Sequence, residues 1–289
     1  MMPITEEIHA FLTANAAAQI QRDDEYLDPA DGLLHCKTCH GLRQTVIPAP
    51  GGTGFLRPRC LCPCQSAAEK QRKAAEEKRE RLEHIQRRKA HGLQDRRLYD
   101  CTFANDSGKN PALTAKARRY VENWENIFRK NIGLLLFGDV GTGKSFLAGC
   151  IANALLEQDV PVLMTNFPTI LNRMTGLFGS ERANFLASLN AYDLLILDDL
   201  GAERGTEYAL EQVFAVIDAR YRSRKPLIVT TNLTLDTLKH PDDLAHARIY
   251  DRILEIWAPI LFGGENLRVE KANETKTAAR NLLLPGNAA

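Results

Sequence analysis

Short hydrophobic runs separated by loop residues dominate the second half of the chain. Each run consists mostly of leucine, isoleucine and valine and is bounded by glycine, asparagine, aspartate or proline. This is the pattern of strands that are buried on both faces of a parallel sheet. We therefore predict strands at 132–138, 160–167, 192–201 and 225–232, and a fifth, of weaker pattern, at 259–264.

Apolar positions recur at helical spacing between these runs. A regular alternation of strands and helices is what a parallel sheet with crossover helices requires. The pattern thus predicts an α/β domain in which a parallel five-stranded sheet is flanked by helices. We expect the helices at about 144–158, at 168–190 in two pieces around Gly176 and Gly179, at 206–223 and at 242–257.

The first third of the chain has a different pattern. Residues 4–21 carry apolar side chains at roughly helical spacing, which predicts a short amphipathic helix. Residues 67–97 mix lysine and arginine with glutamate, with the basic residues in excess and with Leu82 and Ile85 among the few apolar anchors. Such a segment predicts a long, mostly solvated helix, which serves either as a linker or as an arm that binds nucleic acid or a protein.

Composition excludes several classes of protein. The 289 residues are 44% hydrophobic and 25% charged, which argues against a disordered or fibrous chain. The longest apolar runs fall short of the about 18 residues that a membrane span needs, and the N-terminus does not resemble a signal peptide, so we expect no membrane partner. Because the net charge is only +1, affinity for nucleic acid has to come from a local basic surface.

Five of the seven cysteines lie between Cys36 and Cys64. In a chain of this size such clustering suits a metal better than a disulfide framework, so we expect bound Zn²⁺ and a reducing, cytoplasmic location. The cysteines form two short knuckles that offer five thiolates, whereas a structural zinc site takes four ligands. We choose Cys36, Cys39, Cys60 and Cys62, with Cys64 able to replace Cys60 or Cys62, and with His35 or His40 as competing ligands.

The segment GDVGTGKS directly follows the first predicted strand of the sheet and directly precedes a helix. It satisfies the pattern G-x-x-x-x-G-K-[ST] in the structural context that the motif requires. Its glycines allow backbone N–H groups to surround phosphate oxygens, and the helix N-terminus adds its positive dipole end. Lys144 is expected to reach the outer phosphates and Ser145 to bind Mg²⁺. The predicted nucleotide-binding residues are Gly138, Asp139, Val140, Gly141, Thr142, Gly143, Lys144, Ser145 and Phe146.

Polar residues end the next strands of the sheet. Asp198 and Asp199 follow a buried run, and carboxylates at that edge of a parallel sheet lie beside the phosphate loop. We assign Asp198 to the magnesium shell and to nucleotide binding, and Asp199 to the polarisation of the attacking water. Asn232, at the end of the following strand, is expected to hold that water or the γ-phosphate, unless it serves only as a turn residue.

Taken together, these motifs resemble those of AAA+ ATPases, and specifically of the DnaC/DnaI/IstB group of bacterial helicase loaders and transposition helpers. The resemblance rests on GDVGTGKSFLAGCIANALL, YDLLILDDLG, PLIVTTNL and ARIYDRI, which occur in this order over about residues 99–268. It implies an AAA+ P-loop domain with a Walker A loop at 138–145, Walker B at Asp198 and Asp199, and a sensor-1 residue at Asn232.

The resemblance also implies an arginine that acts between subunits. In such ATPases an arginine of one subunit neutralises transition-state charge at the γ-phosphate of its neighbour, so that hydrolysis depends on assembly. Arg252 is the first choice and Arg248 the second, and a homo-oligomer on ATP binding follows. The two arginines lie four residues apart beside Asp251, so an ion-pair cluster within one helix is the alternative interpretation.

Two features depart from the broader AAA+ pattern. Many such ATPases have glutamate after the Walker B aspartate, whereas Asp199 has a shorter side chain. After about Arg268 the remaining chain is too short for the helical lid that often carries a further nucleotide-sensing arginine, and Arg280 is interpreted as a surface residue.

The resemblance implies a DnaC-like loader, which uses ATP and Mg²⁺ to place a replicative helicase on single-stranded DNA and which binds the helicase through residues 1–98. An IstB-like transposition helper that acts on duplex DNA and a nucleotide-switched adaptor with little hydrolysis are the alternatives. The expected organisation is an N-terminal helix and zinc-binding module at 1–66, a charged helical linker at 67–98, an AAA+ ATPase domain at 99–268 and a C-terminal tail at 269–289.

Overall fold

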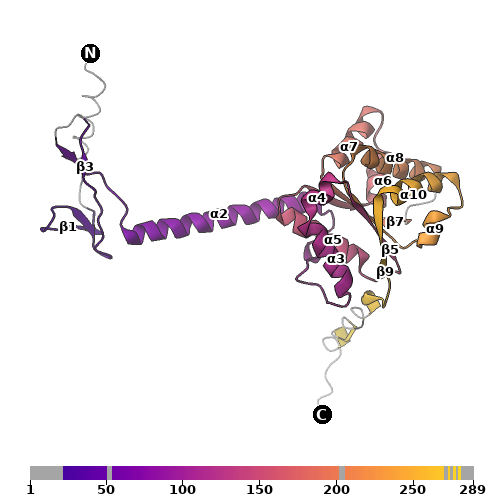
Figure 1. Cartoon of the computed structure of the whole chain (residues 1–289), viewed down its shortest axis with the longest axis horizontal. Coiled ribbons are helices and arrows are strands. Elements are labelled where there is room, and N and C mark those ends of the chain that lie inside the picture. The colour runs from indigo at the N-terminus through magenta and orange to yellow at the C-terminus, as the bar shows by residue number, and fades with distance from the viewer. Residues whose placement is uncertain are drawn as a thin grey trace, which may run out of the picture. The chain divides into compact units, whose positions relative to one another are not determined.

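The described residues of the computed structural model divide into two compact units, with the division between Glu83 and His84 (Figure 1). The amphipathic helix predicted at 4–21 lies outside the described residues. The structure describes residues 22–50, 54–201 and 206–269, together with 273, 276, 277, 279 and 280.

The second unit contains the predicted five-stranded parallel sheet, which confirms the α/β fold. Its strand order is β6-β7-β8-β5-β9, so β5, the strand before the glycine-rich loop, lies between β8 and β9. The strands are β5 (Gly133–Gly138), β6 (Val162–Asn166), β7 (Leu194–Leu200), β8 (Leu227–Thr231) and β9 (Trp257–Phe262).

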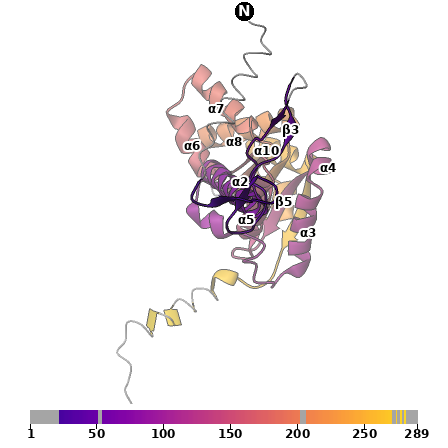
Figure 2. The ribbon, with the colours of Figure 1, turned by 90° about the vertical axis from the view of Figure 1, so that its left-hand side faces the viewer.

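Helices cover both faces of this sheet and bury a separate hydrophobic cluster on each. Leu135 belongs to one cluster and its neighbours Leu134 and Leu136 to the other, as the two-residue period of a strand requires. Figure 2 shows α6 and α7 on the opposite side from α3 and α4. One face carries α3 (Pro111–Glu122), α4 (Trp124–Arg129) and α5 (Lys144–Glu157), and the other carries α6 (Phe167–Thr175), α7 (Ser180–Asn190), α8 (Glu207–Ser223), the short α9 (Leu235–Lys239) and α10 (Leu244–Ile256).

The boundary between α10 and β9 differs from the predicted one. A helix was predicted to 257 and a strand only from 259, whereas β9 begins at Trp257, directly after the helix. Trp257 is buried opposite Gly133 of β5, where a Cβ atom would lie 1.9 Å from Trp257 Cδ1. The missing side chain of Gly133 makes room for the indole, a long-range contact that periodicity does not reveal.

The charged segment forms the helix α2 (Pro63–Gly92), which begins earlier than the predicted residue 67. Proline at the first position of a helix costs no hydrogen bond, which explains the early start. The last turns of α2 belong to the second unit, where Lys89 Nζ donates to Glu157 Oε1 at 2.9 Å. Gly92 allows the helix end to approach β6, and the chain continues into the short helix η1 (Arg96–Asp100).

The length of α2 does not make it a membrane segment. It has 30 residues, many of them charged. Throughout the described ranges, no helix combines the length and the apolar composition that crossing a bilayer requires.

The first unit is small and has little apolar core. β1 (Glu25–Leu27) pairs antiparallel with β2 (Leu34–Cys36), and β3 (Ile47–Pro48) pairs antiparallel with β4 (Phe55–Leu56). Of its described apolar residues, those that are buried are Leu34, Cys36, Ala49, Leu56 and Cys62. A unit with so few buried side chains needs an additional cross-link, which a metal can supply.

Candidate nucleotide and metal sites

A cavity of about 470 Å³ lies where the glycine-rich loop meets the carboxyl ends of β7 and β8. It brings together residues that the sequence predicted from three separate segments. Gly138, Asp139 and Thr142 complete the loop behind this cavity. The lining residues are Asn105, Asp106, Ser107, Lys109, Val140, Gly141, Gly143, Lys144, Ser145, Phe146, Asp198, Asp199, Asn232, Leu267 and Arg268.

The conformation of the loop depends on glycine. Gly138, Gly141 and Gly143 have φ angles of 127°, 81° and 96°, in the region that other residues rarely adopt. A Cβ at Gly138 would lie 2.2 Å from the backbone oxygen of Phe262. Because α5 begins at Lys144, directly after the loop, its N-terminus faces the cavity and favours an anionic ligand.

The Lys144 ammonium is held at the floor of the loop. Its Nζ donates to the backbone oxygens of Gly138 at 2.8 Å and Asp139 at 2.6 Å. Burial lowers the pKa of Lys144 more than the nearby carboxylates of Asp199 and Asp139 raise it, and the positive charge of Arg268 lowers it further. A polyphosphate offers this cation a charged acceptor, which makes a stronger hydrogen bond than a carbonyl does.

Thr230 bonds to both of the neighbouring aspartates. Its hydroxyl donates to Asp198 Oδ1 at 2.6 Å and accepts from the backbone N–H of Asp199 at 2.9 Å. Asp199 has a φ of 65°, and the pairing of β7 with β8 is irregular between Leu197 and Leu200. This irregularity gives Asp198 and Asp199 different partners although both line the same cavity.

Asn232 contacts the second of these carboxylates. Its Nδ2 donates to Asp199 Oδ1 at 3.0 Å, so the amide and the carboxylate form one polar pair at the cavity wall. Asp198 and Ser145 line the same cavity, and a hydroxyl with a carboxylate is a donor set that Mg²⁺ accepts beside phosphate oxygens.

Sequence reasoning missed the contribution of the segment after β9. The backbone N–H of Leu267 donates to Gly141 O at 3.0 Å, and Arg268 lines the cavity. Asn266 is so close to the loop that a Cβ at Gly141 would lie 1.9 Å from its Oδ1. Arg268 therefore reaches the site from the short helical turn at 267–269 that follows β9, whereas a longer helical lid was the only source considered from the sequence.

The two arginines of α10 do not join this cavity within their own chain, since its lining in the described part of the molecule includes no residue of α10. Arg252 stacks on Tyr221, with its Cζ 4.3 Å from the ring centroid. Its Nε lies 3.6 Å from Asp218 on α8 and its Nη1 3.8 Å from Glu255. The alternative prediction placed Arg252 in an ion-pair cluster with Asp251 within one helix. Arg252 instead pairs with Asp218 of the neighbouring helix α8 and with Glu255 of its own helix.

Arg248 is exposed and lines a second cavity of about 340 Å³. Asp251 and Lys239 line the same cavity, so the predicted neighbour of Arg248 is present there. Both arginines thus lie outside the nucleotide cavity of their own chain, Arg248 exposed and Arg252 about one-third exposed.

Four cysteine sulfurs of the first unit converge, each within 4.8 Å of the others. The Sγ atoms of Cys62 and Cys64 are 3.2 Å apart, and those of Cys36 and Cys64 are 3.7 Å apart. A tetrahedral zinc ion with Zn–S bonds of about 2.3 Å places its sulfurs about 3.8 Å apart. The cluster of Cys36, Cys39, Cys62 and Cys64 therefore fits a structural Zn²⁺.

The predicted ligand set, with Cys60 as the third cysteine, is wrong in that one residue: Cys64 belongs to the cluster and Cys60 does not. The Cys60 thiol donates to Leu42 O at 3.5 Å instead. Cys64 lies in the first turn of α2, and the helix start at Pro63 directs its sulfur toward Cys62. The spacing of the cysteines contains no information about this turn. The competing histidines are also bonded elsewhere, His35 to Asp31 and His40 to Tyr26.

Hydrogen bonds shift the pKa values of two of these thiols in opposite directions. The backbone N–H groups of Cys39 and Thr38 lower the pKa of Cys36 to about 6. The hydrogen bond with Cys62 raises the pKa of Cys64 to about 12. A metal that replaces the shared protons relieves the repulsion among the remaining thiolates.

Comparisons with known proteins agree with the nucleotide site. The family model for IstB-like ATP binding proteins matches residues 67–275, more than half of the chain. The replicative helicase loader DnaI of Bacillus subtilis is 31% identical over 150 residues, which cover 48% of this chain and 48% of DnaI. The replicative helicase loader DnaC of Escherichia coli K12 is 31% identical over 162 residues, which cover 53% of this chain and 63% of DnaC.

A solved structure agrees with the fold. The crystal structure of DnaI has a TM-score of 0.50 with this chain at 26% sequence identity, and the superposition covers 63% of this chain and 100% of that structure. In sequence, the matches span less than two thirds of either loader.

The fifth cysteine gives a direct test of the ligand set. We expect Cys64→Ser to lower the zinc content of the purified protein well below one ion per chain, because it removes one of four sulfurs. Cys60→Ser, the matched control, should retain one zinc ion per chain. Mass spectrometry gives the number of zinc ions per chain in each variant. Loss of zinc from Cys60→Ser but not from Cys64→Ser would show that Cys60, and not Cys64, is the ligand.

Proposed function

Because this chain belongs to the family of IstB-like ATP binding proteins, we propose that it hydrolyses ATP and loads a replicative helicase onto single-stranded DNA. The observation that carries the proposal is the cavity in which Lys144, Ser145 and the carboxylates of β7 meet. Its relatives DnaI and DnaC are replicative helicase loaders, which supports the loading role.

Each group of residues that lines the cavity has its own role in phosphoryl transfer. Lys144 and the loop N–H groups bind the phosphates, and Ser145 with Asp198 holds Mg²⁺, which neutralises charge on the phosphate oxygens. Asp199 accepts the proton of the attacking water while Asn232 orients this carboxylate. Arg268 reaches the outer phosphates from the segment after β9 and adds positive charge where the transition state is negative.

The arginines of α10 act on a neighbouring subunit in this proposal. Arg252 is about one-third exposed, and Asp218, Glu255 and Tyr221 hold its guanidinium at the surface. A pre-positioned arginine loses less conformational entropy when it binds a γ-phosphate than a free one does. Arg252 therefore remains the first choice for this role and Arg248 the second, with assembly into a homo-oligomer as the condition for hydrolysis.

A short aromatic surface favours contact with single-stranded DNA. Phe178 is 74% exposed between α6 and α7, and Tyr208 at the start of α8 is 39% exposed. Arg182 joins them, because its Nη2 donates to Leu177 O and its Cζ lies 5.7 Å from the Tyr208 ring centroid. Exposed aromatic rings with an adjacent cation are the usual platform on which unpaired bases stack.

The first unit supplies the contact with a protein partner. It exposes an unusual number of large apolar side chains for its size, which suits a protein interface better than base recognition. Four cysteines that fit Zn²⁺ cross-link the small unit that carries these side chains. The exposed residues are Leu27, Leu42, Val46, Ile47, Phe55 and Leu61.

A transposition helper that acts on duplex DNA is the second candidate, because the family model describes IstB-like proteins in general. The cysteine cluster ahead of the ATPase unit and the similarity to two helicase loaders favour loading. An adaptor that binds ATP without hydrolysis leaves Asp199 and its Asn232 partner without a role.

Phe178→Ala should weaken the binding of a fluorescent oligothymidine by about tenfold, the loss expected when one stacking ring is removed. The matched control is Phe55→Ala, which removes an equally exposed phenylalanine from the first unit. Fluorescence anisotropy gives both affinities. Equal affinity of the Phe178→Ala variant and the wild type would exclude this surface as the DNA contact.

The loader role predicts a complex that ATP hydrolysis releases. The full chain should co-elute with the replicative helicase of its own host on size exclusion, and with ATP it should transfer the helicase to circular single-stranded DNA. We expect Asp199→Asn to form the complex but to fail in release, because the attacking water lacks its base. Asp193→Asn, at the opposite end of β7, is the control. If the wild-type chain does not bind the helicase but binds duplex DNA and a transposase, the result would favour the transposition helper.

A further inference from the structure

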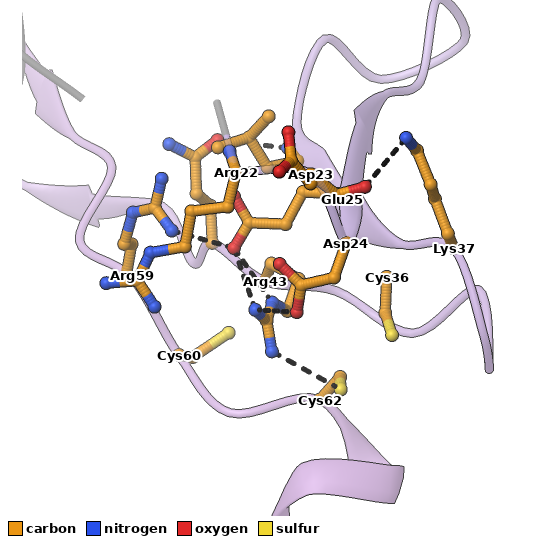
Figure 3. Close-up of polar contacts among 12 residues, drawn as sticks. Arg22, Asp23, Asp24, Glu25, Cys36, Lys37, Arg43, Arg59, Cys60 and Cys62 are labelled. Atoms are coloured by element: carbon orange, nitrogen blue, oxygen red, sulfur yellow. Dashed lines mark hydrogen bonds and ion pairs between the residues drawn. The ribbon is translucent and has the colours of Figure 1, made fainter. Parts of the chain in front are cut away.

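A largely buried ion network centres on Arg43, beside Cys62 of the cysteine cluster (Figure 3). The Arg43 side chain is 3% exposed and its partner Glu25 is fully buried. Arg43 Nε donates to Glu25 Oε1 at 2.9 Å, and Nη2 donates to Asp24 Oδ2 at 2.8 Å. The third arm of the fork, Nη1, lies 3.8 Å from Cys62 Sγ, and Arg59 adds a second cation at 2.7 Å from Glu25.

The backbone of Arg43 joins the two halves of the cysteine cluster. Its N–H donates to Leu34 O at 2.7 Å, in the strand that ends at Cys36, and its carbonyl accepts from the N–H of Cys60 at 2.8 Å, two residues before Cys62. Side chain and backbone thus fix the same two knuckles from one residue.

Four thiolates around one Zn²⁺ carry a net charge of −2, and burying that charge is costly unless donors surround the sulfurs. We infer that Arg43 is a positioning residue for the zinc site: its fork orients Cys62 and offsets part of the thiolate charge, while Glu25 and Asp24 hold the fork in place. The inference rests on the zinc site proposed above. Lysine cannot substitute, because a single ammonium does not match the planar three-way geometry.

The test compares conservative variants of the full-length, zinc-loaded chain. Arg43→Lys keeps the charge beside Glu25 but cannot contact Cys62 at the same time. The affinity of this variant for zinc should therefore be about 10- to 100-fold weaker than that of the wild type. Competition with excess 4-(2-pyridylazo)resorcinol, which binds the released zinc, measures both affinities. Arg57→Lys makes the same exchange at an exposed arginine of the same unit, which donates to Gly32 O, and should remain within about twofold of the wild type.

A third variant separates zinc positioning from folding of the unit. Glu25→Gln removes the charge of the same buried ion pair but keeps an oxygen that accepts from Arg43 Nε. Arg43 therefore stays beside Cys62, and this variant should retain more zinc than Arg43→Lys does. Equal losses in these two variants, or wild-type affinity in Arg43→Lys, would overturn the inference and leave Arg43 as part of the fold alone. A wild-type chain that binds no zinc would instead remove the metal site itself.

Discussion

The parallel pairing of β5 with β8 on one side and β9 on the other is the constraint on which the nucleotide site depends. Because parallel strands end at the same edge, this pairing brings the glycine-rich loop, the polar end of β8 and the segment after β9 to one place. Gly138 makes the approach possible, since any side chain there would collide with Phe262 of β9. The chemistry at this edge therefore comes from segments that lie far apart in the sequence.

Features encoded locally were predictable, and those made by distant contacts were not. Apolar runs and the spacing of Gly143, Lys144 and Ser145 were sufficient for the sheet and the phosphate loop, because both patterns are complete within a few residues. The start of β9 depends on room for Trp257 opposite Gly133, and the position of Arg268 depends on a backbone hydrogen bond to Gly141. Neither contact can be predicted from the spacing of apolar residues in the local sequence.

In the first unit, too, the local pattern was predictable and the distant contacts were not. The clustering of five thiols was enough to predict a metal site, since a chain of this size with free cysteines this close together is more typical of metal binding than of a disulfide framework. The choice between Cys60 and Cys64 depended on where α2 begins, and the buried pairing of Arg43 with Glu25 joins residues 18 positions apart. With little apolar core, this unit is stabilised by polar contacts, whereas two hydrophobic clusters stabilise the second unit.

Titration calorimetry with ATP and Mg²⁺ shows whether the loop at the edge of the sheet is a nucleotide site. We expect saturable binding to the wild-type chain and a loss of about 100-fold in affinity on Lys144→Ala, because this change removes the buried cation that the loop offers to phosphate oxygens. Lys130→Ala, at an exposed lysine outside the cavity, should bind ATP as the wild type does. Equal affinity of the Lys144→Ala variant and the wild type, or no binding to either, would rule out a nucleotide site at this loop.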